Sequence, residues 1–287
     1  HIGFVLGPYI NATGRLYTAE HAFRLLAADN YEEAEKIAGM LIAMNRERKE
    51  MTDSAADKAE KQVELTFSDD DRVIVVFLPD IHESIAGIVA GKLKEKFGKP
   101  AFVITRGTDC AKGSGRSIEE YDMFDEMEKM PELFLKFGGH RLAAGFSMKE
   151  ENIKEFREKI NENCTLTEEN LMTKVNIDME MPLKYSDTEL AKELDMLAPY
   201  GIGNPRPLFA VKDIRIENPR IFGKNGNVLK ATAVDNEGNK RKAVYFGQAD
   251  QMIEYCNSKK NISMTYALNI NNYMGRESLE LNIKNYR

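Results

Sequence analysis

Three glycine-bearing stretches of this 287-residue sequence carry cations or hydroxyls suited to binding phosphate. Glycine leaves the backbone N–H groups unobstructed, and an adjacent guanidinium, imidazole or hydroxyl can donate to the same anion. The first stretch covers residues 136–147, the second residues 113–118 and the third residues 11–16, and all three are expected to be loops or turns. Their candidate phosphate-binding residues are Arg15, Ser114, Arg116, Ser117, Gly138, Gly139, His140 and Arg141.

His82 is a further candidate because it follows an apolar run at residues 72–78, and ligand sites gather at the carboxyl ends of buried strands. Taken singly, each feature is also consistent with a glycine turn, a solvated arginine or a core histidine. Several of them in one α/β unit favour a site for a charged, repeating ligand. The stretch at 113–118 is not a P-loop, because it lacks the Lys-Ser/Thr pair at the required spacing.

The elements that position these residues follow from hydrophobic periodicity. Apolar residues at three- and four-residue spacing predict two helices over residues 18–66, the second long enough to connect two lobes. The β-branched run 72–78, a helix over 85–97 and a second apolar run over 101–105 form a strand–helix–strand unit. Short helices are expected over 122–130 and 151–164, and the alternation over 175–181 predicts a half-exposed strand.

The last 80 residues contain short β-rich runs separated by turns. Strands are expected over residues 214–216, 228–234, 242–246, 262–270 and 279–283, and a helix over 249–256. Residues 208–287 carry 13 lysines and arginines against 8 aspartates and glutamates, a local charge of +5 on a chain of net charge −6. This pattern describes an OB-fold, which binds single strands through cations and stacked aromatics. The available aromatic residues are Phe222, Tyr245, Phe246, Tyr266, Tyr273 and Tyr286.

Composition excludes several protein classes. No apolar run reaches membrane-spanning length, and no signal peptide is recognisable. The three cysteines are far apart and odd in number, which favours neither a disulfide framework nor a zinc site and suggests a reducing cytoplasm. The apolar start without an initiator methionine leads us to expect a piece of a longer protein.

These stretches resemble, in order along the chain, segments of the RecJ-type single-stranded-DNA-specific exonucleases of the DHH phosphoesterase family. Residues 11–16 are similar to the Asn-Ala-x-Gly-Arg segment that follows the family's catalytic domain, and His82 with residues 87–93 is similar to its histidine-led segment. Residues 113–118 resemble its glycine-serine-arginine-serine loop, and residues 138–146 the signature turn of the DHH-associated domain. Residues 197–207 resemble the segment that leads into the C-terminal barrel.

The resemblance implies a DHH-associated α/β domain with a mixed sheet and flanking helices, preceded by a helical connector and followed by an all-β OB-fold barrel. The implied boundaries are residues 1–66 for the end of the DHH region and the connector, 67–185 for the α/β domain, 186–207 for a linker helix and loop, and 208–287 for the OB-fold.

The implied function is the substrate-binding portion of an exonuclease that hydrolyses single-stranded DNA from the 5′ end, in repair and recombination. The family's Mn²⁺ or Mg²⁺ ions are held by an N-terminal DHH domain, and no Asp-His-His occurs here, so this chain is expected to hold no metal. His140 and Arg116 would stabilise charge on the attacked phosphoryl group, and Arg15, His82, Ser114, Ser117, Gly138, Gly139 and Arg141 would bind the substrate.

The expected partners are single-stranded DNA and other DNA-repair proteins, with no membrane. We expect this chain to bind single strands weakly and not to cut them. Two alternatives stay open: a phosphodiesterase acting on short oligonucleotides or cyclic dinucleotides, and a non-catalytic module that binds single-stranded DNA.

Overall fold

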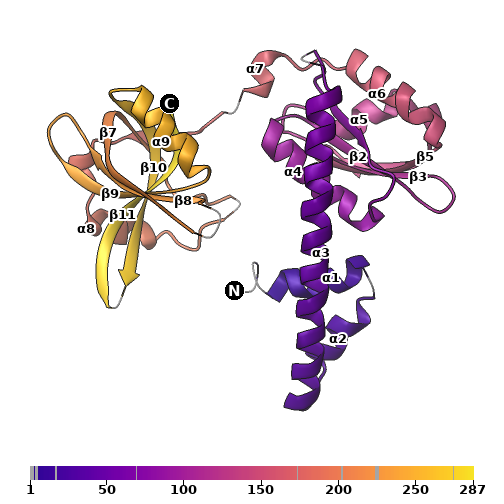
Figure 1. Ribbon diagram of the computed structural model, residues 1–287, viewed down its shortest axis with the longest axis horizontal. Coiled ribbons are helices and arrows are strands. Elements are labelled where there is room, and N and C mark those ends of the chain that lie inside the picture. The colour runs from indigo at the N-terminus through magenta and orange to yellow at the C-terminus, as the bar shows by residue number, and fades with distance from the viewer. Residues whose placement is uncertain are drawn as a thin grey trace. The chain divides into compact units, whose positions relative to one another are not determined.

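The computed structural model of the protein describes residues 3, 6–16, 18–68, 70–172, 174–201, 203–223, 226–273 and 275–287, and it excludes the side chains of Arg15, Leu16 and Tyr273. The chain divides into two compact units, His1–Thr173 and Lys174–Arg287. Figure 1 shows both units and labels most of their helices and strands; the units are described separately below.

The first unit opens with helices α1 (Gly7–Leu16), α2 (Glu20–Leu26) and α3 (Tyr31–Thr66). α3 begins where the Asn30 side chain accepts a 2.9 Å hydrogen bond from the backbone N–H of Glu33. Two helices over 18–66 are therefore confirmed, the second of them 36 residues long. The expected loop at 11–16 was wrong, because these residues complete α1, where Ala12 and Thr13 are fully buried.

A five-stranded mixed sheet follows, in the order β1-β2-β3-β5-β4. Its strands are β1 (Ile74–Phe77), β2 (Ala101–Arg106), β3 (Ala111–Arg116), β4 (Phe134–His140) and β5 (Ala143–Met148). β1 and β2 are parallel, as the predicted strand–helix–strand unit requires, and the remaining pairs are antiparallel. The connecting helix α4 (Glu83–Phe97) ends at Gly98, which has a φ of 64°.

Helices cover the two faces of this sheet to different extents. On one face α3 and α4 pack against β1 and β2 through aliphatic side chains such as Val63, Val89 and Val103. On the other face α5 (Met123–Glu128) and α6 (Ile153–Glu162) close a core that includes Phe102 and Phe156, whose ring centroids lie 5.1 Å apart. Short 3-10 turns at Pro131–Leu133 and Glu150–Asn152 join these elements, and α7 (Glu168–Leu171) follows α6.

Both glycine-rich stretches of this unit lie mainly on strands, so the expectation of loops or turns over 113–118 and 136–147 was wrong for most of their length. Residues 141–142 do form a turn, between β4 and β5, and residues 117–118 follow the end of β3. A Cβ on Gly113 would lie 2.1 Å from the Phe146 ring, and one on Gly115 would lie 2.8 Å from the Phe102 ring. These two glycines therefore leave room for aromatic rings of the core and do not form a flexible turn. Because the backbone pairs in the ladder, the predicted nest of free N–H groups does not form at β3.

The second unit contains β6 (Met179–Glu180), a 3-10 turn at Leu183–Tyr185, α8 (Thr188–Asp195), β7 (Phe209–Phe222), β8 (Val228–Val234), β9 (Lys240–Phe246), α9 (Ala249–Ser258), β10 (Ile262–Tyr273) and β11 (Arg276–Tyr286). The pairings run β7–β8–β9–β11–β10, and β10 pairs again with β7. β9 and β11 are parallel, and the other neighbours in this ring are antiparallel. The predicted strands and the helix between β9 and β10 are confirmed, although β7 extends well beyond the run predicted over 214–216 at both ends.

The strand predicted over 175–181 is reduced to the two residues of β6, which pair in parallel with β7. This pairing ties residues 174–185 to the second unit, whereas the sequence analysis assigned them to the α/β domain. Contacts across a shared sheet thus place the division after Thr173 rather than after residue 185.

Glycine at position 113 is expected to be required for stability. We expect Gly113→Ala to lower the free energy of unfolding by about 1–3 kcal/mol, because the added methyl group overpacks the core at Phe146. Gly138→Ala is the matched control, since a Cβ there meets nothing within 4 Å, and we expect a change within about 0.5 kcal/mol. Urea denaturation measures both, and equal stabilities of the two variants would contradict the packing argument.

Candidate functional site

Strands β3, β5 and β4 present a sheet face that lies beyond α4, which borders it along β3. Alternate residues of a strand point to the same face, and antiparallel register aligns them across strands. The result is a grid of three rows, here called the open face. Its rows are Arg116–Ala143–His140, Ser114–Gly145–Gly138 and Lys112–Ser147–Lys136.

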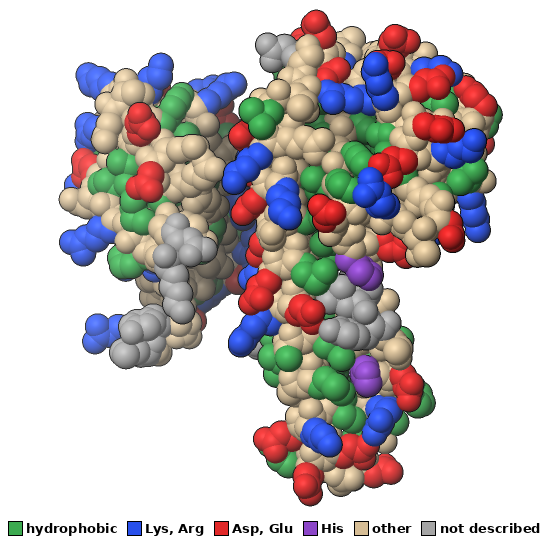
Figure 2. All heavy atoms as spheres, turned by 45° about the vertical axis from the view of Figure 1, so that its right-hand side comes forward, with side chains coloured by type: hydrophobic (Ala, Val, Ile, Leu, Met, Phe, Trp, Pro, Cys, Tyr) green, Lys and Arg blue, Asp and Glu red, His purple; other side chains and the backbone are tan. Residues whose placement is uncertain are grey.

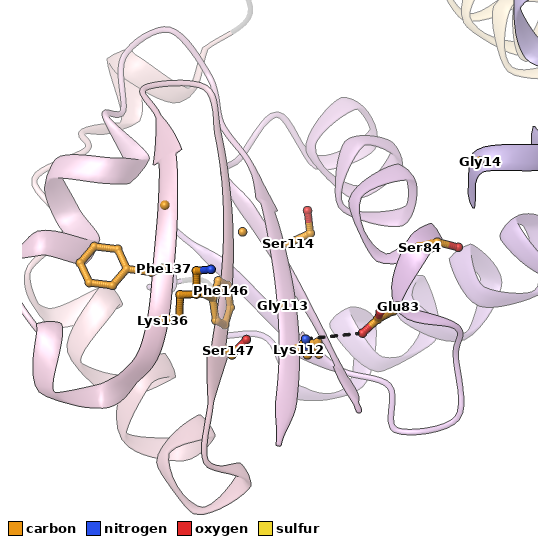
Figure 3. A pocket seen from close by; sticks show the side chains of 12 residues that line it. Gly14, Glu83, Ser84, Lys112, Gly113, Ser114, Lys136, Phe137, Phe146 and Ser147 are labelled. Atoms are coloured by element: carbon orange, nitrogen blue, oxygen red, sulfur yellow. Dashed lines mark ion pairs between the residues drawn. The ribbon is translucent and has the colours of Figure 1, made fainter. Parts of the chain in front are cut away.

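The centre of the open face has almost no side chains. Gly145 and Gly138 are exposed, and a Cβ on either would meet nothing within 4 Å. A cavity of about 670 Å³ lies over this floor, and Glu83 and Ser84 of α4 and Gly14 of α1 complete its lining. Figure 3 shows Phe137 pointing away from the other side chains that line it. The cavity can therefore admit a ligand close to the backbone of the sheet.

Arg116 is held in place at one corner of the open face. Its Nη1 donates to the Gly115 carbonyl at 2.7 Å and to the Ser114 Oγ at 3.2 Å. A Cβ on Gly87 of α4 would lie 2.7 Å from Arg116 Nη2 and 2.9 Å from Ser114 Oγ. A side chain at position 87 would have to displace the Arg116 guanidinium or the Ser114 hydroxyl. The guanidinium is thereby positioned before any ligand arrives, which reduces the entropy lost on binding.

His140 occupies the other corner of the same row. Its Nδ1 accepts a 3.3 Å hydrogen bond from the backbone N–H of Leu142, so the proton of the neutral ring resides on Nε2. Nε2 can then donate to an anion above the sheet. Arg116 and His140 are two strand spacings apart, roughly 10 Å between their Cα atoms. The structure thus brings the two predicted catalytic residues to one face of one sheet.

Other predicted site residues have different surroundings. Ser117 is buried, and its hydroxyl donates to the Tyr121 carbonyl at 2.7 Å. Arg141 donates to the Glu119 carbonyl, away from the grid. The Ser117 hydroxyl and the Arg141 guanidinium therefore bind backbone carbonyls outside the grid, and neither belongs to the open face.

His82 is the N-cap of α4, and its Nδ1 lies 2.7 Å from the Ser84 Oγ and accepts from the Ser84 N–H at 3.3 Å. Gly139 faces the opposite side of the sheet, where a Cβ would lie 2.3 Å from the Ala143 carbonyl oxygen. The side chain of Arg15 lies outside the described residues, although its backbone belongs to α1. Of the nine predicted residues, the open face contains Ser114, Arg116, Gly138 and His140.

Sequence reasoning missed residues that complete the site. They are Gly87, Lys112, Lys136, Gly145 and Ser147. The signal was present in the period-two pattern, since Lys-x-Ser-x-Arg over 112–116 and Lys-x-Gly-x-His over 136–140 put every polar residue on one face of a strand. Interpreting the glycines as loop markers concealed that pattern.

The described residues contain no group of three or more His, Cys, Asp or Glu side chains able to hold a metal ion. The donors present among the described residues therefore do not fit a metal centre. No described helix has the length and apolar character needed to cross a membrane.

The second unit presents a different candidate surface on β7, β8 and β9. Phe222, Val228 and Phe246 are aligned in register on these three strands, and the two rings are 47% and 61% exposed. Lys230 lies on β8, between the two strands that carry the rings, and Lys242 lies on β9, the strand of Phe246. Lysine and arginine side chains outnumber acidic ones on the part of this unit visible in Figure 2. Exposed rings beside cations are the arrangement on which unpaired bases stack.

The structure also shows which predicted aromatics belong to the core. Tyr266 is fully buried, and its hydroxyl donates to the Met181 carbonyl at 2.8 Å; burial raises the pKa of this hydroxyl. Tyr245 and Tyr286 pack edge to face with centroids 5.6 Å apart. Tyr273 lies outside the described side chains. Phe222 and Phe246 are therefore the described candidates for base stacking.

Comparison with known proteins gives matches to both units. Residues 70–165 match the DHHA1 domain model, and residues 177–285 match the RecJ OB domain model. The single-stranded-DNA-specific exonuclease RecJ of Bacillus subtilis is 33% identical over 99% of this chain and 36% of its own length.

Crystal structures of Thermus thermophilus RecJ in complex with Mg²⁺ and with Mn²⁺ match the whole chain at 26% identity. Their TM-scores are 0.83 and 0.81, and this chain covers 43% and 41% of theirs. The chain spans less than half the length of each of these relatives.

The contact between Gly87 and Arg116 predicts a specific binding defect. We expect Gly87→Ala to weaken binding of a single-stranded oligonucleotide roughly five- to tenfold, because the methyl group displaces a charged donor. Stability should be unchanged or raised by up to about 1 kcal/mol, since alanine favours helix. Gly91→Ala, one turn along α4 with open space at its Cβ, is the control and should bind normally. Fluorescence anisotropy measures the affinity, and equal affinities of the two variants would contradict this positioning.

Proposed function

The chain carries a DHHA1 domain followed by a RecJ OB domain and is homologous to the RecJ exonucleases, and from this we propose that it is the DNA-binding portion of a single-strand-specific 5′–3′ exonuclease. The observation that carries the proposal is the open face, where donors border a bare glycine floor within the DHHA1 domain. A floor without side chains suits a sugar-phosphate backbone, which needs close approach and charge rather than shape-specific pockets.

We propose roles for the residues of the first row. Arg116 offers a preorganised guanidinium, and His140 offers the Nε2 proton, so both can donate to phosphate oxygens. Donors fixed before the reaction stabilise the charge that develops on an attacked phosphoryl group at little reorganisation cost. Ser114 and the glycines Gly138 and Gly145 would line the path of the strand next to that group.

Divalent metals form a separate part of the proposal. The Thermus relatives are described with Mg²⁺ and Mn²⁺. We propose that such ions are held by a DHH domain outside the residues described here. The metal would supply the activated water, and this chain's own residues would bind and orient the phosphate.

For the second unit, we propose that the ring of strands is an OB barrel whose outer face at β7, β8 and β9 binds bases. Support comes from the closed pairing pattern and from the exposed rings of Phe222 and Phe246 beside Lys230. Each base stacked on an aromatic side chain contributes about 1–3 kcal/mol. Stacking of this kind tolerates any base sequence, which suits a nuclease that acts on single strands in general.

The binding test uses the first row of the open face. We expect Arg116→Gln and His140→Asn each to weaken binding of a 12-nucleotide oligothymidylate roughly 10- to 100-fold, because each removes a charge-assisted donor. Arg116→Gln, which removes a charge, should also lower the slope of log affinity against log salt by about 0.7, whereas His140→Asn removes a neutral donor and should leave the slope unchanged. Arg24→Gln on α2, which removes an exposed guanidinium elsewhere, is the matched control.

Wild-type affinity that ignores salt would argue against a phosphate site. A cyclic dinucleotide that binds more tightly than the 12-nucleotide strand would favour the small-substrate phosphodiesterase instead. Binding without contribution to catalysis, once the chain is joined to a metal-bearing domain, would favour the non-catalytic module.

The aromatic surface makes an independent prediction. We expect the double variant Phe222→Ala/Phe246→Ala to weaken single-strand binding roughly 10-fold or more while leaving the salt slope unchanged, because stacking involves no counterion release. Met196→Ala removes another exposed apolar side chain of the same unit and should have no effect. Anisotropy over a salt series gives both quantities, and a change in slope without a change in affinity would exclude stacking.

A further inference from the structure

We infer that the third row of the open face, Lys112–Ser147–Lys136, is a second phosphate-binding site, which holds the DNA strand at a phosphate other than the one bound by Arg116 and His140. The inference rests on the proposed function and adds to it. It assigns further binding residues on the strand's path and predicts that affinity depends on substrate length.

The three side chains of this row meet the requirements of an anion site. Lys112, Ser147 and Lys136 are aligned in register on β3, β5 and β4, and all three line the cavity of about 670 Å³. Two ammonium groups thus flank a hydroxyl on one face of the sheet. Ammonium groups on flexible stems are suited to phosphates that pass in several orientations.

The middle row leaves a clear path between the two sites. Ser114 contributes the one side chain between them, because Gly145 and Gly138 have none. The bulky residue of this region, Phe146, points into the core on the other face. A continuous sugar-phosphate chain can therefore pass from the first row to the third along the sheet surface.

The distance between the rows sets which phosphates they bind. Arg116 and Lys112 are four residues apart on β3, and His140 and Lys136 are four apart on β4, which is roughly 13 Å along a strand. A stacked DNA strand rises about 3.4 Å per nucleotide, so this span corresponds to about four nucleotides, and to fewer in a stretched strand. A dinucleotide held by the first row cannot reach the third.

The local electrostatics leave both lysines available. Lys112 has an ion pair with Glu83 at 4.0 Å, which Figure 3 marks with a dashed line. Both side chains are about half exposed (44% and 56%). Exposed pairs of this kind contribute little, so a phosphate can replace Glu83. Lys136 is exposed and has no ion pair within the described part of the chain. Glu83 therefore opposes an incoming strand at the row where it pairs with Lys112.

The experiment compares two oligothymidylates of 2 and 12 nucleotides, both 5′-phosphorylated, by isothermal titration calorimetry. For Lys112→Gln/Lys136→Gln we expect roughly tenfold or greater weakening with the 12-nucleotide strand and a salt slope lower by about 1.4. Affinity for the dinucleotide should stay within twofold of wild type. Lys154→Gln on α6 removes an exposed lysine elsewhere in the same unit and should change neither.

Glu83→Gln provides an opposite change that does not depend on the lysine variants folding. We expect it to tighten binding of the 12-nucleotide strand a few-fold and to leave dinucleotide binding unchanged. If Lys112→Gln/Lys136→Gln folds and binds the 12-nucleotide strand as wild type does, or weakens both lengths equally, the second site is refuted. If Arg116→Gln also leaves binding unchanged, the proposed function fails with it; if Arg116→Gln still weakens binding, the proposed function stands alone.

Discussion

The structure of the first unit depends on one steric constraint. Strands β3, β5 and β4 must lack a side chain at particular positions on each face, for a different reason on each. On the core face, Gly113 and Gly115 leave room for the rings of Phe146 and Phe102. On the open face, Gly138 and Gly145 leave the backbone uncovered beneath the cavity. Glycine weakens a strand, and the aromatic packing among Phe102, Phe134, Phe146 and Phe156 offsets that cost.

The same constraint extends to α4. Because Gly87 allows this helix to lie against Arg116 and Ser114, the helix that covers β2 also fixes a donor of the site. The helix is positioned by small and branched residues, Ala86, Val89 and Ala90 among them, that pack on β1 and β2. Core packing and placement of the guanidinium are thus consequences of one helix position, and a change in either would alter the other.

Sequence patterns predicted those elements whose local preferences agree with their final environment. The β-branched run of β1, the amphipathic helix α4 with Gly98 at its end and the strands of the second unit are of this kind. α1 and β3 were missed because Pro, Gly and Asn argue against regular structure locally. Ala12 and Thr13 are nevertheless buried against the neighbouring helices, and Gly113 is required by a ring 33 residues away in the sequence. Such long-range packing leaves no local signal.

The candidate site was predicted in part for the same reason. Arg116 and His140 could be chosen from residue type, but the row that joins them follows from antiparallel register, which depends on which strands pair. Ser117 shows the converse, since its neighbour Arg116 belongs to the open face while its own hydroxyl donates to the Tyr121 carbonyl and is buried. Because β3 ends at Arg116 and the chain turns away at Ser117, proximity in sequence to a site residue is weak evidence of membership in the site. The alternation of Lys112, Ser114 and Arg116 carries more information than the glycines between them, because polar side chains repeated at period two can reach one extended ligand from one strand.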